Sequence, residues 1–490
     1  MTANLHLLLP EFLLASLAIV VLAVDLFIPA SRQRLLAWLS IGGMTGLFIL
    51  SLALLWGRND LLYGGLFHID SYYLFFRAFF ILMGIVIILS SMEFVEQRLT
   101  HPGEFYAIIV FSVLGMGLMT AAGELLTAYI SLEVLSFSLY ILVSYARDNA
   151  RSNEAGIKYI IVGAFSSAIL LYGLSLVYTS LGTTHFAEIN AKLAAGDSTS
   201  PVLWIGLGLM LAGLGFKLAA VPFHMWAPDV YEGAPTPITA YLAIASKAAA
   251  FALVLRLFAE ALMPAIGDWR IILAIIAAIT MTVGNLVAIP QTNIKRMLAY
   301  SGIGQVGYLL MGVAALGHVS GGSVFTNPQA SSGIILHLAG YAFSNMAAFA
   351  VIIAFQNRTG KENIPDYAGM ADRHPFMAAA LAIALMSLAG LPFFAGFFTK
   401  FYLFAAAARE GFLWLAGLAV VNSLISLYYY LMVLKQMYIT KAEDESKLRF
   451  SPLLIGVTAV MVLGIFFVGV YPRPLVDAID AATRALLSII

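Results

Sequence analysis

The sequence predicts an all-α polytopic membrane protein, and three observations point to this class: the composition, the scarcity of charge and the recurrence of long apolar runs. Of the 490 residues, 61% are hydrophobic and only 11% are charged, whereas a soluble domain carries about 25% charged residues. The mean hydropathy is +0.93. So few charges cannot cover a water-facing surface, which excludes a soluble globular protein, a disordered chain and a fibre.

Long apolar runs, separated by short polar or Gly/Pro loops, define the predicted membrane spans. A helix needs about 20 apolar residues to cross the hydrocarbon core of a bilayer. No basic segment precedes the first run, so we expect a retained first helix rather than a cleaved signal peptide. We predict about fourteen transmembrane helices, over residues 6–29, 33–56, 71–93, 103–122, 124–145, 156–181, 202–225, 235–262, 268–291, 295–316, 331–356, 375–408, 413–440 and 450–471.

The distribution of Lys and Arg among the loops predicts the orientation of the chain. Together with the span ends that adjoin them, the loops after odd-numbered spans contain fourteen of these residues, and the loops after even-numbered spans contain four. Because basic loops stay in the cytoplasm, the odd-numbered loops are expected on that side. Both termini would then lie outside the cytoplasm.

The composition also limits the chemistry of this chain. Lys plus Arg and Asp plus Glu are equal at 26 each, so nothing favours nucleic acid as a partner. The absence of Cys removes disulfides, zinc–thiolate sites, iron–sulfur clusters and c-type haem attachment. Neither a Walker loop nor a dinucleotide-binding glycine fingerprint is present. We therefore expect no cofactor and no metal in this chain, so that any electron carrier belongs to a partner.

A short sequence pattern that recurs along the chain predicts two inverted repeats. The tetrapeptide LAGL stands at 211–214, ahead of Lys217 and Pro222, and again at 388–391, directly before Pro392, with Lys400 further on. Each Pro is expected to interrupt an apolar helix. These are the seventh and twelfth predicted spans, and an odd period of five inverts the second copy, as in transporters whose site lies at paired helix breaks. The predicted segments are 1–102 (three helices), 103–262 (first inverted five-helix repeat), 268–440 (second inverted five-helix repeat) and 450–490 (last helix and short tail).

Four ionisable residues fall well inside predicted spans: Glu133, Lys217, Lys247 and Lys400. A charge in the bilayer core costs at least about 2.5–3.5 kcal/mol, so these residues are the candidate functional groups. The alternative for the lysines is snorkelling to the headgroups from a helix end. Arg77 and Arg256 lie nearer span ends and are expected to pair structurally, whereas Glu124 and Lys158 are expected at the membrane interface.

Glu133 and Lys217 are the natural ion pair among these four. An ionised Glu in a span needs a cation, and a buried Lys needs an anion. A Lys keeps its proton while paired and releases it more readily once the pair opens. A pair that opens and closes would act as a proton switch, and a static structural ion pair is the alternative.

Polar side chains at helical spacing form three stripes that should face the interior of the bundle, because lipid cannot satisfy them. They would either hold waters between the charged groups or serve as interhelical hydrogen bonds. His337 opens one stripe, and histidine can relay protons near neutral pH. His224, just after Pro222, would either join this relay or cap the interrupted helix. The stripes are His337/Tyr341/Ser344/Asn345, Ser301/Gln305/Tyr308 and Asn422/Ser423/Ser426/Tyr430.

Four stretches of the sequence resemble one known family. They are GFKLAAVPFHMWAPDVYEGAPTPITAYLAIASKAAAF (215–251), NIKRMLAYSGIGQVGYLLMG (293–312), NEAGIKYIIVGAFSSAILLYG (153–173) and LAGLPFFAGFFTKFYLF (388–404). Together they resemble the antiporter-like membrane subunits of respiratory complex I, the NADH-quinone oxidoreductase. The likeness covers nearly the whole chain.

The resemblance implies a site for proton translocation. It implies a proton half-channel in each repeat and a polar axis that joins them. In this axis Glu133 pairs with Lys217, Lys247 continues the route and Lys400 is the terminal proton carrier. His224 and His337 are the possible relay residues.

The resemblance also implies partners and cofactors. Quinone reduction in neighbouring subunits would drive proton pumping through this chain, which has no redox centre of its own. NADH, FMN, iron–sulfur clusters and quinone would be held by partner subunits. The neighbours would be the antiporter-like subunits L and M, the small subunits K, J, A and H, and lipids, in the inner (plasma) membrane. The alternative function is a subunit of a multi-subunit cation/proton antiporter, which needs no redox partner.

Overall fold

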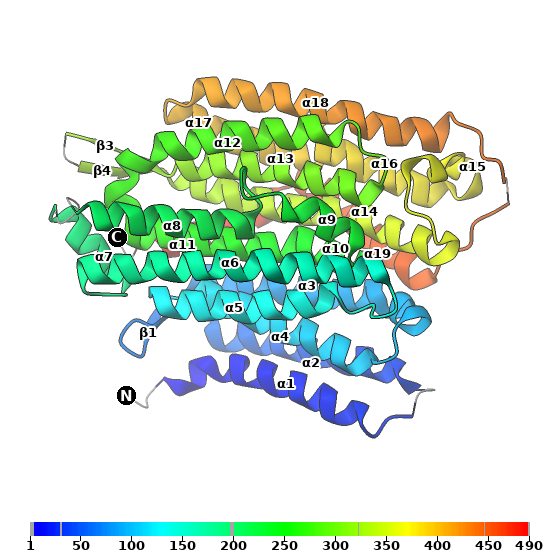
Figure 1. The fold of residues 1–490 in the computed structure, drawn as a ribbon, viewed down its shortest axis with the longest axis horizontal. Coiled ribbons are helices and arrows are strands. Elements are labelled where there is room, and N and C mark those ends of the chain that lie inside the picture. Colours follow the sequence, from blue (N-terminus) through cyan, green and yellow to red (C-terminus); the bar gives the residue numbers. More distant parts are fainter. Residues whose placement is uncertain (1–3, 30–31, 197–199, 322, 445, 489–490) are drawn as a thin grey trace.

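Long helices run side by side along the longest axis of the molecule (Figure 1). The computed structural model describes residues 4–29, 32–196, 200–321, 323–444 and 446–488, so the outermost residues of the predicted segments 1–102 and 450–490 lie outside the described part. The N-terminal region contains η1 (Leu5–Leu8), α1 (Leu9–Asp25), α2 (Arg34–Leu55), the hairpin β1 (Asp60–Leu62) and β2 (Phe67–Ile69), and α3 (Ser71–Arg98).

The central region follows in chain order. Its elements are α4 (Pro102–Ala121), α5 (Leu125–Val143), α6 (Ala150–Leu181), α7 (Phe186–Ala194), α8 (Pro201–Leu218), α9 (Trp226–Gly233), α10 (Thr236–Tyr241), the π-helical turn η4 (Leu242–Ser246), α11 (Lys247–Leu257), a second π-helical turn η5 (Phe258–Leu262) and the 3-10 turn η6 (Met263–Ala265).

The remaining elements complete the chain. They are α12 (Ile266–Ala288), α13 (Ile294–Ala314), the hairpin β3 (Gly317–Ser320) and β4 (Ser323–Thr326), α14 (Pro328–Thr359), η7 (Ile364–Tyr367), α15 (Met370–Arg373), α16 (Pro375–Ala389), α17 (Ala395–Arg409), α18 (Leu413–Tyr438), α19 (Pro452–Val470) and α20 (Arg473–Leu487). Helices α13 and α14 are almost wholly buried, whereas α6 and α18 mostly face outward. The core of the molecule therefore lies around α13 and α14.

The all-α membrane class is confirmed, while the span count of fourteen stays a prediction. Within the described residues, 12 helices are long and apolar enough to cross a membrane. One of them, Thr236–Ala288, has 53 residues and covers two predicted spans, which are separated by the turn η6 with Pro264. The predicted span 375–408 is instead divided between the shorter helices α16 and α17.

The two predicted helix interruptions are present. Helix α8 ends at Leu218, and Ala219 adopts a left-handed φ of 60° before Pro222. Helix α16 ends at Ala389, and Gly390 adopts a φ of 90° before Pro392. A left-handed residue after the last turn ends a helix, and a following Pro cannot continue it. The inverted relation between the two regions remains a prediction.

The short boundary between the predicted spans 103–122 and 124–145 is also confirmed. Helix α4 ends at Ala121, and Glu124 caps the N-terminus of α5 by accepting hydrogen bonds from the backbone N–H groups of Leu126 and Thr127. Burial acts to raise the pKa of Glu124, but the hydrogen bonds from Thr127, Thr184 and the two backbone N–H groups outweigh burial and hold it below its ordinary value. The carboxylate is therefore favoured at this helix N-terminus.

The two ends of the bundle differ in character. The loops between α5 and α6, α12 and α13, and α18 and α19 lie at the right end of Figure 1, and these loops follow odd-numbered predicted spans. The β-hairpins and α7 lie at the left end, where the N and C marks also lie. The first and last described residues thus lie at the end opposite to the loops that follow odd-numbered predicted spans, and the side of the membrane on which that end lies stays a prediction.

Candidate functional site

Glu133 on α5 and Lys217 on α8 face the same region but do not form the direct ion pair that the sequence predicts. Lys217 Nζ donates to Ser136 Oγ at 2.9 Å, and Glu133 Oε1 accepts from Ser167 Oγ at 2.6 Å. Ser136 lies three residues after Glu133, so the amine is bound on the same helix face. The structure therefore holds the two side chains apart, each bonded to a different serine hydroxyl group.

Lys217 owes its position to the first helix break. It lies in the last turn of α8, where the free carbonyl groups favour a cation. Across the break, the indole Nε1 of Trp226 donates to Phe216 O at 2.9 Å. This bond fixes the start of α9 against the end of α8. Lys217 is only 4% exposed, so it does not snorkel to the surface.

Lys247 lies at the junction between η4 and α11 and is held by shape rather than by hydrogen bonds. Its Nζ has no hydrogen-bond partner among the described residues, and it lies 5.7 Å from the centre of the Tyr231 ring. A Cβ on Gly302 would lie 2.5 Å from this Nζ and 3.2 Å from the Tyr341 hydroxyl. The absence of a side chain at Gly302 thus makes room for the amine between α11, α13 and α14.

Lys400 lies at the second helix break and is fully hydrogen-bonded. Its Nζ donates to Leu388 O at 2.8 Å, to Ala389 O at 3.2 Å and to Ser423 Oγ at 3.1 Å. The ring of Tyr308 lies 5.0 Å from the same Nζ. The last carbonyl groups of α16 have no partner within their helix, and the ammonium group supplies one.

His337 on α14 connects to this second cluster. Its Nε2 bonds Gln305 Oε1 at 3.0 Å, and its Nδ1 bonds Thr399 Oγ1 at 3.0 Å. Since an amide oxygen only accepts hydrogen bonds, Nε2 carries the proton. Gln305 Nε2 in turn donates to Leu388 O at 3.4 Å, the carbonyl group that also binds Lys400. The structure therefore brings His337, Gln305 and Lys400 together.

His224 lies in the loop between α8 and α9 and is not joined to the other candidates. Its Nδ1 has no hydrogen-bond partner in the described part of the chain. No hydrogen bond between described residues links it to Lys217 or Lys247. The sequence alternatives for His224, relay or cap, therefore stay open.

Asn285 on α12 is a polar residue of the site that the sequence analysis did not single out. It donates to Tyr308 Oη at 3.2 Å and to Asn422 Oδ1 at 3.4 Å, and its Oδ1 accepts from Tyr429 Oη at 2.9 Å. It thereby connects two predicted stripes. The signal in the sequence was a lone Asn in the middle of an otherwise apolar run.

Arg77 and Arg256 pair structurally, as expected. Arg77 bonds Glu11, and its Nε donates to Ser51 Oγ at 2.8 Å. Arg256 bonds Asp70 at 2.9 Å and also Glu260. Both arginines are almost completely buried, so these pairs stabilise the fold because unpaired buried charge is costly.

A large polar cavity opens at the end of the bundle that holds the basic loops. Its volume is about 870 Å³, and its wall combines segments 146–151, 232–235 and 356–366. At its base, buried Lys295 bonds Ala234 O at 3.1 Å and Glu362 Oε1 at 3.1 Å. Within the described residues no group of three or more His, Cys, Asp or Glu side chains is arranged to hold a metal ion.

Comparison with known proteins assigns the chain to a family. Residues 122–426 match the family described as NADH:quinone oxidoreductase/Mrp antiporter, transmembrane region. The fold and the buried amines thus define an antiporter-like multi-pass membrane protein, and the chain belongs to this family.

Individual relatives and solved structures show which members of the family the chain is similar to. The chain is 43% identical over 479 residues to a protein of Moorella thermoacetica (97% of each chain) and 42% identical over 487 residues to one of Heliobacterium modesticaldum (99% of this chain and 100% of the relative), both named NADH-quinone oxidoreductase subunit N. Among solved structures, a chain of respiratory complex I from Thermus thermophilus with bound aureothin matches at a TM-score of 0.79 and 28% identity, over 96% of this chain and 99% of that one. A chain of the Mrp complex from Dietzia sp. matches at a TM-score of 0.86 and 21% identity, over 99% and 98%.

Proposed function

We propose that this chain is the proton-translocating membrane-arm subunit N of a respiratory complex I. The observation that carries the proposal is the series of three buried amines, Lys217, Lys247 and Lys400, on interrupted or π-containing helices inside an apolar bundle. Charges at membrane depth are rare and mark pathways for ions or protons. Relatives at 42–43% identity over nearly the whole chain are named NADH-quinone oxidoreductase subunit N, which supports the proposal.

The contacts support a route for the proton. The polar cavity near Lys295 takes up protons at the cytoplasmic end, and α9 connects it to the axis, because Ala234 at its end binds Lys295 and Tyr231 lies beside Lys247. From Lys247 the proton passes to the Gln305–His337–Lys400 cluster. Opening and closing of the Glu133–Lys217 pair switches the affinity of the axis for protons.

The remaining features of the proposal concern the assembly. NADH, FMN, iron–sulfur clusters and quinone bind to partner subunits, among which are the antiporter-like subunits L and M and the small subunits K, J, A and H. The chain lies in the inner membrane with both termini outside the cytoplasm, and residues 103–262 and 268–440 form its two half-channels. Moving one charge against 100 mV costs about 2.3 kcal/mol, so quinone reduction in the partners must supply this energy.

The alternative, a subunit of a cation/proton antiporter, has less support. The Mrp chain shares the fold at 21% identity, whereas the relatives at 42–43% identity are named as complex I subunits. A complex that purifies with flavin, clusters and quinone reductase activity would agree with the main proposal. Cation-driven proton exchange without an electron donor would contradict it.

The decisive experiment measures protons pumped per electron in the assembled complex, reconstituted into vesicles. Lys217→Ala and Glu133→Gln should each lower this ratio, because each removes one side of the switch. Lys441→Ala, at an exposed loop position, is the matched control and should leave the ratio unchanged. An unchanged ratio in both site variants, with assembly intact, would reject the role of the pair.

A further inference from the structure

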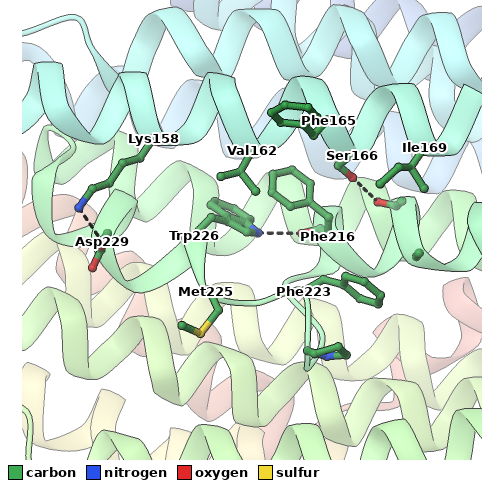
Figure 2. A pocket seen from close by; sticks show the side chains of 13 residues that line it. Lys158, Val162, Phe165, Ser166, Ile169, Phe216, Phe223, Met225, Trp226 and Asp229 are labelled. Carbon is green, nitrogen blue, oxygen red and sulfur yellow. Dashed lines mark hydrogen bonds and ion pairs between the residues drawn. The ribbon is translucent and has the colours of Figure 1, made fainter.

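A groove on the flank of the bundle runs along the first helix break. It lies between α6, α8 and α9, and Figure 2 shows its lining. Its volume is about 360 Å³, and its walls are apolar, with Val162, Phe165, Phe216, Phe223, Met225 and Trp226 among the lining residues. Phe165 and Met225 at its margin are 69% and 76% exposed. The groove is thus open on the side that faces the hydrocarbon of a bilayer.

The groove ends at a polar compartment. Lys158 and Asp229 line the groove and also a second pocket of about 250 Å³, whose other lining residues include Arg151, Glu154, Glu232 and Arg296. Figure 2 shows Lys158 and Asp229 together at one end of the groove. An apolar compartment that continues into a charged one has the form of a site for an amphipathic molecule.

The charged compartment contains both signs in equal number. Lys158 bonds Glu154 at 2.8 Å and Asp229 at 2.9 Å. Arg296 bonds Asp229 at 2.7 Å and Glu232 at 3.0 Å. The third cation, Arg151, forms no ion pair with any described residue. The side chains of Lys158, Glu154, Asp229, Glu232 and Arg296 are only partly buried, so their charges are accessible to a headgroup.

We propose that this two-part site binds a zwitterionic phospholipid with a primary amine, of the phosphatidylethanolamine type. One acyl chain occupies the apolar groove, the phosphate contacts Arg151 and Lys158, and the ammonium group donates to Glu154 and Glu232. Glu154 and Glu232 bond Lys158 and Arg296 through one carboxylate oxygen each, so the other oxygen can accept from a lipid ammonium group, and an anionic lipid without an amine supplies no such donor. A quinone would leave the whole polar compartment unused.

The site also lies directly against the first helix break. The groove walls Phe216 and Phe223 flank the break on both sides, so an acyl chain seated there covers the segment that follows Lys217. The bound lipid is therefore in contact with the element that positions Lys217.

The test uses the intact complex in nanodiscs that contain trace phospholipid with a photoreactive acyl chain. Phosphatidylethanolamine, phosphatidylcholine and phosphatidylglycerol with the same acyl chains are compared, and adducts are mapped by peptide mass spectrometry. We expect adducts in 162–169 and 212–226 about fivefold more often with phosphatidylethanolamine than with phosphatidylcholine, whose quaternary amine cannot donate; this ratio corresponds to about 1 kcal/mol.

Two site variants and one control variant make the result specific. Val162→Trp fills the groove and should abolish the adducts, whereas Ile161→Trp, at an exposed neighbouring position outside the groove, should retain them. Glu154→Gln lies on the exposed surface and should bring the ratio of the two zwitterionic lipids close to one. Equal labelling by all three lipids, stronger labelling by phosphatidylglycerol, or displacement by a quinone would each overturn the proposal.

Discussion

The two halves of the molecule hold their buried amines in different ways. In the second half, Lys400 donates to two carbonyl groups at a helix end and to a hydroxyl group, which uses all three of its N–H donors. In the first half, Lys217 has a single hydroxyl acceptor, and Lys247 has no hydrogen-bond partner in the described part of the chain. The amine at the second break is therefore held more firmly than the other two, which have unused capacity for a partner that comes and goes.

The largest expected effect is a difference in stability between substitutions of Lys400, whose amine is fully hydrogen-bonded, and of Lys247, whose amine has no hydrogen-bond partner in the described part of the chain. Lys400→Met should destabilise the protein by about 2–3 kcal/mol, because it leaves two buried helix-end carbonyl groups without their donor. Lys247→Met removes no hydrogen bond, and it removes an amine whose burial without a partner among the described residues is itself costly. Thermal unfolding of the purified complex should show a clear loss for the first variant and almost none for the second. Equal losses would show that the two sites are built alike.

A second prediction concerns the single acceptor of Lys217. Ser136→Ala removes that acceptor, and a hydrogen bond to a charged group contributes about 1.5–3 kcal/mol. Proton translocation coupled to quinone reduction should slow about tenfold, since about 1.4 kcal/mol corresponds to a factor of ten in rate. Ser138→Ala is the matched control, because Ser138 donates only to Val134 O on its own helix. Similar rates in the two variants would remove Ser136 from the switch.

A third prediction tests the link between His337 and the second break. Thr399→Val keeps the volume but leaves His337 Nδ1 without its partner at 3.0 Å, which should cost about 1 kcal/mol of stability. Thr399→Ser restores the hydroxyl group and should recover most of it. The denaturant or temperature midpoint of the complex measures both. A valine variant as stable as the parent would show that this hydrogen bond does not stabilise the cluster.

The smallest effect lies at the cap of α5, just before the membrane-spanning helix Leu125–Val143. The pKa of Glu124 is lower in the folded protein than its ordinary value, so the carboxylate stabilises the fold above about pH 4.3, and this contribution disappears as the pH falls through the lower folded value. Glu124→Gln should cost about 1 kcal/mol at neutral pH. The difference between parent and variant should shrink on acidification. A difference that grows at low pH would contradict the sign.

The sequence predicted the class, the breaks and the burial of the candidate lysines, because these depend on residue type and local order. Apolar runs and the positions of Pro222 and Pro392 are local signals. The span count was harder, since the 3-10 turn at Met263–Ala265 joins two helices without a polar loop.

Partners of buried side chains could not be predicted, because they depend on how helices are rotated and packed. Ser136 rather than Glu133 receives Lys217, and this choice reflects the reach of one side chain across two helices. Asp70 pairs with Arg256 at a separation of 186 residues. Nothing in the local sequence of either residue indicates the other.

The π-helical turn η4 ends directly before Lys247. Such a turn contains one residue more than an α-helical turn, and one residue corresponds to a rotation of about 100° around the helix axis. Removing any single residue from Leu242–Ser246 would therefore swing Lys247 away from Gly302 without altering its chemistry. The direction in which the Lys247 side chain points therefore depends on the number of residues in the segment before it. An insertion or deletion in that segment is more damaging than most substitutions.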